Sequence, residues 1–243
     1  MRRGSSQEQV VSTSANANGR RFPYIKICGL TDPDEAAACA RLGADAVGLV
    51  FYPPSPRNLE LDRAVTVAAA LPAGVVAAGV FVDPEWDVLA EAVSRCRLGI
   101  VQLHGRESPD LIQRVRTQLH VAVWKGLFTT KAPYMSEADA YAADAYLVEC
   151  GKGPLPGGNA MVWEWGAAAD FVRSHPTVLA GGLDPDNVGR AIHAALPDAV
   201  DASSGLEARP GRKDLAKVAR YIDEVKQTAA FYREKGIRPK QVF

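Results

Sequence analysis

The sequence predicts an α/β fold, a single (β/α)8 TIM barrel over residues 23–243, preceded by a disordered tail over residues 1–22. Two observations carry this prediction. From Tyr24 onward, eight short apolar runs alternate with segments of helical length, as in repeated βα units on a parallel sheet. Eight units within about 220 residues match a TIM barrel, whereas an open doubly wound sheet rarely needs eight evenly spaced units. No linker or change of composition divides the chain after residue 23, so one domain is expected.

The strands and several helix starts can be assigned from local patterns. The predicted strands are Tyr24–Ile27, Ala46–Phe51, Val75–Phe81, Ile100–Leu103, Val121–Lys125, Ala145–Val148, Thr177–Ala180 and Ala199–Asp201. Four pairs place a capping oxygen before a proline suited to the first helical position: Asp32-Pro33, Asp83-Pro84, Ser108-Pro109 and Asp184-Pro185. Glu35 follows Asp32 by three residues, which predicts a capping box.

Composition narrows the class of partner. The chain is 47% apolar and 23% charged, and its 28 Lys and Arg residues balance 28 Asp and Glu residues. This formal net charge of +0 disfavours nucleic acid and anionic membranes and favours a small, weakly charged partner. The protein itself is expected to be a monomer or homodimer. The uncharged run Ala64–Val82 is long enough for a membrane span. Because Leu71-Pro72-Ala73-Gly74 interrupts it, a helix end, a turn and a buried strand are expected instead.

Cysteine spacing and the N-terminal segment bear on localisation. The four cysteines lie far apart and include no C-x-x-C pair, which argues against structural zinc or a disulfide framework and favours the cytoplasm. Residues 1–21 are rich in Ser, Asn, Gln and Arg and have no apolar core, so they do not form a secretory signal. A leader for an organelle is the less favoured alternative.

Polar residues gather where the predicted strands end, which is where barrel enzymes build their active sites. Cys28, His104, Glu149 and Asp201 end the first, fourth, sixth and eighth strands, and Arg57 lies after the second. Gly181, Gly182, Ser203, Ser204 and Gly205 follow the seventh and eighth strands, where barrels commonly bind phosphate through backbone N–H groups. This arrangement favours a phosphorylated sugar as ligand; the alternative is that these are turn glycines. Ile27-Cys28-Gly29-Leu30 stands where a dinucleotide fingerprint would be, which disfavours a nicotinamide enzyme.

These motifs, in this order, resemble the phosphoribosylanthranilate isomerase family of tryptophan biosynthesis over about Tyr24 to Val225. The matching segments are Lys26-Ile27-Cys28-Gly29, Ser55-Pro56-Arg57, Gly79-Val80-Phe81-Val82, Gln102-Leu103-His104-Gly105, Leu179-Ala180-Gly181-Gly182-Leu183 with Asn187-Val188, and Asp201-Ala202-Ser203-Ser204-Gly205-Leu206-Glu207 with Pro210-Gly211 and Lys213-Asp214. The resemblance implies an Amadori rearrangement of N-(5-phosphoribosyl)anthranilate to 1-(2-carboxyphenylamino)-1-deoxyribulose 5-phosphate, without a metal or cofactor.

The resemblance also implies residue roles. Cys28 matches the general base, Arg57 the residue that meets the anthranilate carboxylate, and Asp201 a substrate-orienting aspartate. Gly181, Gly182, Ser203, Ser204 and Gly205 match the phosphate-binding loops, while His104 either touches the substrate or holds its own loop. Lys26 shares a strand face with Cys28, so we expect it either to favour the thiolate or to sit in an internal ion pair.

The chain departs from the family pattern at the general acid. The family has Asp in a Leu-Leu-Asp context followed by Gly-Gly-Thr-Gly and Phe-Asp-Trp, whereas this chain has Leu147-Val148-Glu149-Cys150, Gly157-Gly158-Asn159-Ala160 and Val162-Trp163-Glu164-Trp165. Glu149 would carry the acid on a stem longer by about 1.5 Å. Since a misplacement of about 1 Å can cost roughly 100-fold in rate, retained activity requires compensation.

Two alternatives therefore stay open. One is a divergent isomerase or lyase of the same phosphosugar-barrel group that acts on another N-ribosylated arylamine. The other is a non-catalytic paralogue that binds phosphosugar. Retention of Cys28, Arg57, Asp201 and a carboxylic acid at position 149 favours catalysis, because a binding protein needs only the anion site.

Overall fold

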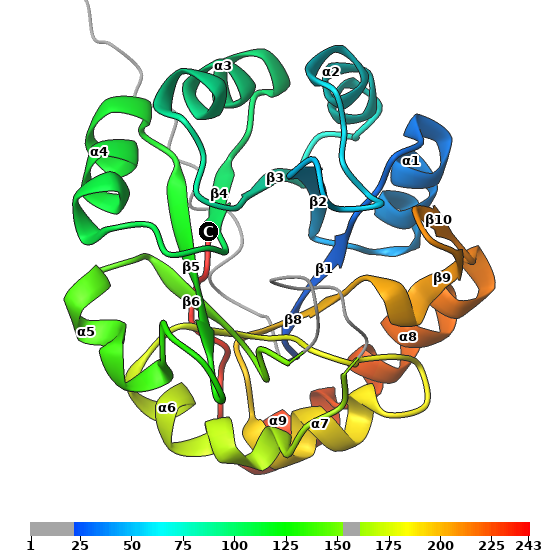
Figure 1. The fold of residues 1–243 in the computed structure, drawn as a ribbon. Coiled ribbons are helices and arrows are strands. Elements are labelled where there is room, and N and C mark those ends of the chain that lie inside the picture. Colours follow the sequence, from blue (N-terminus) through cyan, green and yellow to red (C-terminus); the bar gives the residue numbers. More distant parts are fainter. Residues whose placement is uncertain (1–21, 153–160) are drawn as a thin grey trace, which may run out of the picture.

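Eight parallel strands close into a barrel in the computed structural model, which describes residues 22–152 and 161–243. The strands follow one another around the ring in chain order, and β8 (Ala199–Ala202) pairs with β1 (Tyr24–Cys28) to close it (Figure 1). The predicted fold class, a (β/α)8 barrel, is confirmed. The disordered tail predicted over residues 1–22 lies outside the described residues except for Phe22.

All eight predicted strands are present. Between β1 and β8 they are β2 (Ala46–Phe51), β3 (Val76–Phe81), β4 (Ile100–Leu103), β5 (Ala122–Phe128), β6 (Ala145–Glu149) and β7 (Thr177–Leu179). The largest error is in β5, which runs three residues beyond the predicted end at Lys125 and pairs with β6 as far as Glu149. A hairpin of β9 (Glu207–Arg209) and β10 (Arg212–Lys213) was not predicted, because strands this short carry no readable alternation.

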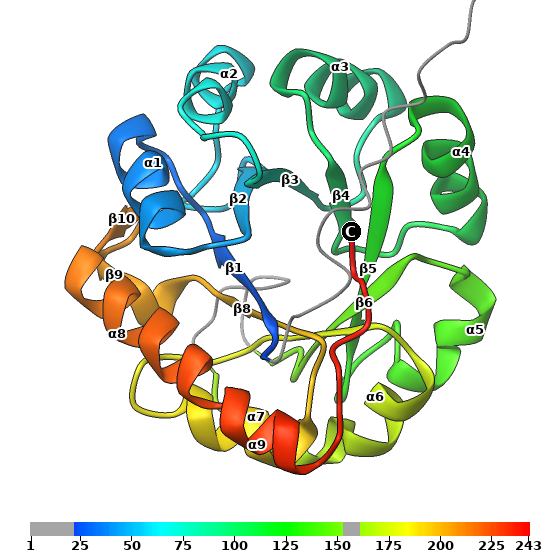
Figure 2. The same cartoon turned by 180° about the vertical axis from the view of Figure 1, so that it is seen from behind.

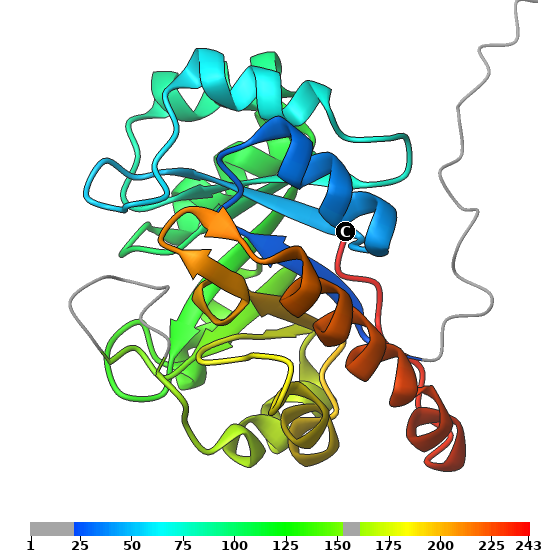
Figure 3. The ribbon, with the colours of Figure 1, turned by 90° about the vertical axis from the view of Figure 1, so that its right-hand side faces the viewer.

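Helices surround the barrel (Figures 1 and 3). They are α1 (Pro33–Leu42), α2 (Leu61–Ala69), α3 (Trp86–Cys96), α4 (Pro109–Leu119), α5 (Ala138–Tyr141), α6 (Ala169–Ser174), α7 (Val188–Ala195), α8 (Leu215–Gln227) and α9 (Ala229–Glu234), with 3-10 turns η1 (Met135–Glu137), η2 (Trp165–Ala168) and η3 (Ser204–Leu206). None of the helices in residues 22–152 and 161–243 combines the length and apolar character needed to cross a membrane. The run Ala64–Val82 contains the end of α2, a turn and β3, as predicted.

Two predicted helix starts are confirmed and two are wrong. Asp32 caps α1 by accepting backbone N–H groups, and Ser108 caps α4. By contrast, α3 begins at Trp86 and α7 at Val188, several residues after the predicted caps Asp83 and Asp184. Their carboxylates bond backbone N–H groups of loops instead, at 2.6 Å and 2.8 Å respectively.

Half of the capping box predicted at Glu35 is present: Asp32 Oδ1 accepts the backbone N–H of Glu35 at 3.2 Å, but the Glu35 side chain is engaged elsewhere. Its Oε1 accepts a 2.6 Å hydrogen bond from Arg212 Nε, and its Oε2 accepts the backbone N–H of Lys213 at 3.1 Å. Glu35 therefore ties α1 to the β9–β10 hairpin, because a buried carboxylate gains more from a guanidinium than from a single backbone donor.

The amino-terminal end of the barrel is closed by apolar packing and by the C-terminal segment. Trp124 on β5 donates its indole N–H to the carbonyl of Val242 at 2.6 Å, and Phe243 meets the ring of Tyr24 at 5.1 Å. Figure 2 shows this red segment crossing that end of the barrel. The carboxyl ends of the strands, where the polar residues were predicted to gather, lie at the opposite end of the barrel.

A buried ion pair organises the loop after β4. Lys125 Nζ lies 2.7 Å from Glu107 Oε2, and both side chains are fully buried. Lys125 also donates to the carbonyl of Gly105 at 2.7 Å, while Glu107 accepts the backbone N–H groups of Asp83 and Gly105. This network fixes the loop that begins at His104.

Replacing Glu107 tests this network. We expect Glu107→Gln to lower the free energy of unfolding by about 3–5 kcal/mol, because it leaves the Lys125 ammonium buried without its counter-charge. Urea unfolding gives the measurement. The control is Asp170→Asn, which breaks an exposed pair with Arg173 and should leave stability nearly unchanged. Equal losses in both variants would contradict the assignment.

Candidate active site

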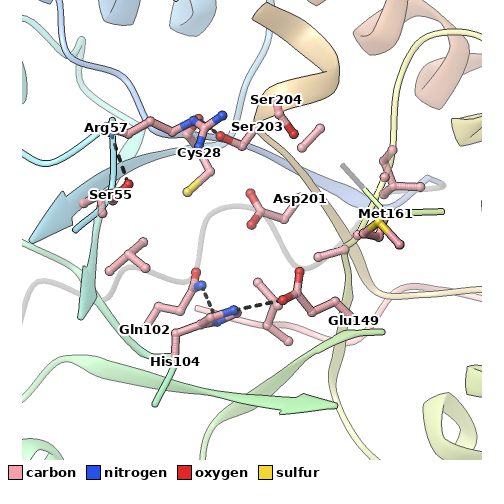
Figure 4. Close-up of a pocket in the computed structure, with 18 of the residues that line it drawn as sticks. Cys28, Ser55, Arg57, Gln102, His104, Glu149, Met161, Asp201, Ser203 and Ser204 are labelled. Atoms are coloured by element: carbon pink, nitrogen blue, oxygen red, sulfur yellow. Dashed lines mark hydrogen bonds and ion pairs between the residues drawn. The ribbon is translucent and has the colours of Figure 1, made fainter. Parts of the chain in front are cut away.

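One pocket at the carboxyl end of the barrel brings together nearly all of the predicted site residues (Figure 4). It holds about 900 Å³ of space, counting the part open to solvent at its mouth. Its lining includes Cys28, Arg57, His104, Glu149, Gly181, Gly182, Asp201, Ser203 and Ser204. Of the predicted set, Gly205 does not line the pocket; an added Cβ there would lie 2.2 Å from the carbonyl oxygen of Leu183, so it packs the loops after β7 and β8 together.

Cys28 is the last residue of β1 and is buried against β2. A Cβ added at Gly48 of β2 would lie 2.6 Å from Cys28 Sγ, so glycine makes the space that the thiol occupies. Below it, Lys26 Nζ lies 2.9 Å from Asp201 Oδ2, with both side chains buried. The internal ion pair considered for Lys26 is thus present, and Figure 4 shows Asp201 between Cys28 and Glu149.

The charges around Cys28 act in opposite directions. Burial raises the pKa of the Cys28 thiol, the Lys26 ammonium lowers it and Asp201 raises it, and the pKa ends above its ordinary value. Burial lowers the pKa of Lys26, but Asp201 and Cys28 outweigh it, so this pKa is raised. Lys26 is therefore charged at neutral pH, and Cys28 rests as a thiol.

Glu149 ends β6 and is held by His104 on the far side of the pocket. His104 Nε2 lies 3.3 Å from Glu149 Oε1, and His104 Nδ1 lies 3.1 Å from Gln102 Nε2. The imidazole also packs edge-to-face on Phe128, with ring centroids 5.4 Å apart. A fixed histidine thus determines where the Glu149 carboxyl lies.

Arg57 is buried in a bidentate ion pair. Its Nε and Nη2 donate to Glu207 at 2.7 Å and 2.8 Å, and Lys213 Nζ lies 3.0 Å from the same carboxylate. Burial raises the pKa of Glu207, but Arg57 and Lys213 outweigh it, and the pKa is lowered. Since a guanidinium carries five N–H donors, this pair leaves a second edge of Arg57 for another carboxylate.

Side chains donate hydrogen bonds to three carbonyls of the loop after β7, which contains the pair Gly181-Gly182. Trp163 Nε1 donates to the carbonyl of Ala180 at 2.9 Å, and Trp165 Nε1 donates to that of Gly181 at 3.2 Å. Asn187 Nδ2 donates to the carbonyl of Gly182 at 2.8 Å. Both glycines have positive φ, 89° and 68°. With three successive carbonyls bonded, the loop is fixed in one orientation, as an anion site built from backbone N–H groups requires.

Sequence reasoning missed Gln102, Glu207 and Gly48 as parts of the site. Gln102 and Glu207 stood inside recognised motifs, but each acts through another side chain, Gln102 through His104 two residues away and Glu207 through Arg57, 150 residues away, and a linear motif does not reveal these contacts. Gly48 had a readable signal, because a glycine inside an apolar strand often marks a close approach. The segment 157–160, where the chain departs from the family pattern, lies outside the described residues.

In the described part of the chain, no group of three or more His, Cys, Asp or Glu side chains is arranged to hold a metal ion.

The sequence profile of the N-(5'-phosphoribosyl)anthranilate isomerase family matches residues 25–224. The chain belongs to this family. The N-(5'-phosphoribosyl)anthranilate isomerase of Desulfatibacillum aliphaticivorans is 48% identical over 219 residues, which cover 90% of this chain and 98% of the relative. The family resemblance seen in the motifs is confirmed.

Solved structures agree. A crystal structure of a phosphoribosylanthranilate isomerase in complex with reduced 1-(o-carboxyphenylamino)-1-deoxyribulose 5-phosphate is 33% identical, with a TM-score of 0.75 over 85% of this chain and 100% of the other. A second structure, of monomers made from the dimeric enzyme of Thermotoga maritima, has the same identity, coverage and TM-score. Relatives of this chain thus bind a small molecule, and one is dimeric.

Glu207 provides a pH-dependent test of the Arg57 anchor. A carboxylate whose pKa is lowered on folding contributes stability above its unfolded pKa of about 4.3, and this contribution is lost as pH falls through the lowered value. We expect Glu207→Gln to cost about 3 kcal/mol of unfolding free energy at pH 7. The difference from wild type should shrink as pH falls below about 4.3.

Urea unfolding at a series of pH values from 7 downward measures this difference. Glu60→Gln, at an exposed position, is the matched control and should leave the unfolding free energy nearly unchanged at pH 7. A difference between wild type and Glu207→Gln that does not change with pH would contradict the assignment.

Proposed function

We propose that this chain isomerises N-(5'-phosphoribosyl)anthranilate to 1-(2-carboxyphenylamino)-1-deoxyribulose 5-phosphate in tryptophan biosynthesis, with Cys28 as general base and Glu149 as general acid. The observation that carries the proposal is that a thiol and a carboxyl group line one pocket whose wall is also formed by glycine and serine loops after β7 and β8. One acid and one base suffice for this rearrangement.

The reaction begins at the ribose ring. Glu149 donates a proton to the ring oxygen as the C1–O bond breaks, and the nitrogen lone pair forms the C1=N bond of a protonated Schiff base. Cys28 then takes the proton from C2; the C2–H electrons form a C1=C2 bond and the C1=N electrons return to nitrogen. The resulting enol becomes a ketone as C1 gains a proton and the C2 hydroxyl loses one. No atom is gained or lost overall.

The longer stem of Glu149 is compatible with the acid role because its carboxyl is anchored. His104 lies 3.3 Å from one carboxyl oxygen, which leaves the other oxygen to carry the proton toward the substrate. The compensation that the sequence required would then come from the end of β4, which β5 separates from β6 in the ring. This geometry favours catalysis over the phosphosugar-binding paralogue.

The base role of Cys28 depends on Lys26. Burial favours the thiol over the thiolate, so a cation next to the sulfur is needed to keep the thiolate accessible. Lys26 supplies this charge and is itself held by Asp201.

The remaining side chains bind the substrate. The free edge of Arg57 suits the anthranilate carboxylate, and Asp201 orients the sugar. The backbone of Gly181 and Gly182 with Ser203 and Ser204 takes the phosphate, while Gly205 packs the two loops together. Ser203 Oγ donates to the carbonyl of Cys28 at 3.0 Å, which links the phosphate loop to the base.

We further propose a single barrel domain over residues 23–243, acting in the cytoplasm as a monomer or homodimer on a phosphoribosyl substrate rather than on nucleic acid or membranes. The dimeric relative supports the homodimer. The four cysteines are unpaired, as in a reducing compartment, and the formal net charge is +0.

Turnover tests the assignment. The disappearance of phosphoribosylanthranilate fluorescence should be rapid with the wild type and slower by about 100-fold or more with Cys28→Ala and Glu149→Gln. Glu149→Asp should keep part of the activity because it retains a carboxyl group. Glu91→Gln, an exposed substitution on α3, is the control.

Other outcomes separate the alternatives. A wild type that binds phosphosugar without turnover would identify a binding paralogue. Turnover of another N-ribosylated arylamine in place of the anthranilate compound would identify a divergent isomerase.

Thiol alkylation tests the Lys26 contribution. Because the pKa of Cys28 is raised, its alkylation by iodoacetamide should keep accelerating above pH 8.5, roughly the usual thiol pKa. Lys26→Met removes the charge that lowers this pKa, so the profile should move to higher pH. Mass spectrometry of the Cys28 peptide gives the rate, and Lys235→Met at an exposed position is the control. An unchanged profile in Lys26→Met would remove this role.

A further inference from the structure

Gln102, His104 and Glu149 form a row along the pocket wall from β4 to β6. Gln102 has no role assigned so far, and His104 has none beyond its contact with Glu149. Gln102 and His104 are two residues apart on and just after β4, so both face into the barrel. Both are buried, with 2% and 5% of their surface exposed, and both line the pocket (Figure 4). They connect in series: Gln102 Nε2 to His104 Nδ1 at 3.1 Å, and His104 Nε2 to Glu149 Oε1 at 3.3 Å.

The imidazole in this row has little freedom to turn. A Cβ added at Gly126 of β5 would lie 2.7 Å from His104 Nδ1, so the ring occupies the space that a side chain there would fill. Phe128, which is also on β5, packs against the imidazole ring at an interplanar angle of 87°. Each ring nitrogen therefore keeps one partner.

Hydrogen-bond chemistry then determines the tautomer. An amide NH2 group only donates, so His104 Nδ1 must accept from Gln102. The ring proton is then on Nε2, from which it is donated to Glu149 Oε1. With Oε1 occupied as an acceptor, the catalytic proton belongs on Oε2.

The amide orientation itself has support. In this orientation the buried Gln102 Oε1 has no hydrogen-bond partner among the described residues. In this orientation the NH2 group faces the imidazole and the atom left without a partner is a carbonyl oxygen, and orphaned buried carbonyl oxygens are more common than orphaned N–H groups.

We propose that Gln102 is a positioning residue that fixes His104 in the tautomer protonated on Nε2, so that His104 holds Glu149 with Oε2 presenting the proton to the substrate. The proposal rests on the proposed function in taking Glu149 as the acid. Gln102 thus takes part in the proton transfer through His104, although Gln102 itself does not contact Glu149.

The test combines a spectroscopic signature with kinetics. In protein labelled with 15N in its histidine rings, the His104 signals are assigned by their loss in His104→Gln. We expect wild-type His104 to show an unprotonated Nδ1 and a protonated Nε2. Gln102→Glu presents an acceptor in place of the donor, so Nδ1 should gain a proton and kcat should fall by about 100-fold. Gln113→Glu, the same charge change at an exposed site on α4, should change neither.

A rescue pair distinguishes positioning from packing. Gln places its amide near the position of His Nε2, whereas Asn places it near that of Nδ1. His104→Gln should therefore retain most of the turnover, with the loss in His104→Asn falling on kcat rather than on KM. Equal losses in the two variants would overturn the proposal.

The outcomes separate this proposal from the proposed function. A wild type that turns over substrate with His104 protonated on Nδ1 would overturn the positioning role alone. A wild type with the expected ring signals but no turnover would support the tautomer assignment and contradict the proposed isomerase activity.

Discussion

The pairing of buried charges is the constraint on which this site depends. A charged group inside a barrel is tolerated only when an opposite charge and hydrogen bonds replace the lost water. The described residues meet this requirement with Lys26 and Asp201 below the pocket, Arg57, Glu207 and Lys213 at its side, and Lys125 and Glu107 behind it. Each group supports a different part of the pocket: the thiol, the guanidinium and the loop that carries His104. The reactive end is therefore held by electrostatics, whereas the opposite end is held by apolar packing.

The two proposed proton-transfer groups are tuned in different ways. Burial has the largest effect on the pKa of the Cys28 thiol. Because burial disfavours the thiolate, formation of the thiolate depends on Lys26. Glu149 is governed by geometry, since His104 fixes one of its oxygens. The base is thus sensitive to charge in its surroundings, and the acid is sensitive to small displacements of β4. This division explains how a glutamate can occupy the position of an aspartate when His104, at the end of the nearby strand β4, supplies an anchor.

Much of the architecture could be predicted from sequence because strand runs and polar strand ends are local signals. Cys28, His104, Glu149 and Asp201 were found this way, and the ring geometry brought them together. Errors arose where a side chain had a choice of partners: Glu35 was expected to cap α1 but bonds Arg212, and Asp83 serves a loop instead of α3. The β9–β10 hairpin has strands too short to show alternation, and the role of Glu207 depends on its contact with Arg57, 150 residues away in the sequence. Such contacts leave no periodic pattern.

Two glycines on strands next to the reactive groups have a consequence for how this lineage diverges. Gly48 and Gly126 present no side chain to a ligand, yet a methyl group at either would push the sulfur or the imidazole out of place. A new substrate can therefore be accommodated by changes in the loops, whereas a side chain at Gly48 or Gly126 would displace Cys28 or His104. Both positions therefore constrain the site, although neither presents a side chain to the ligand.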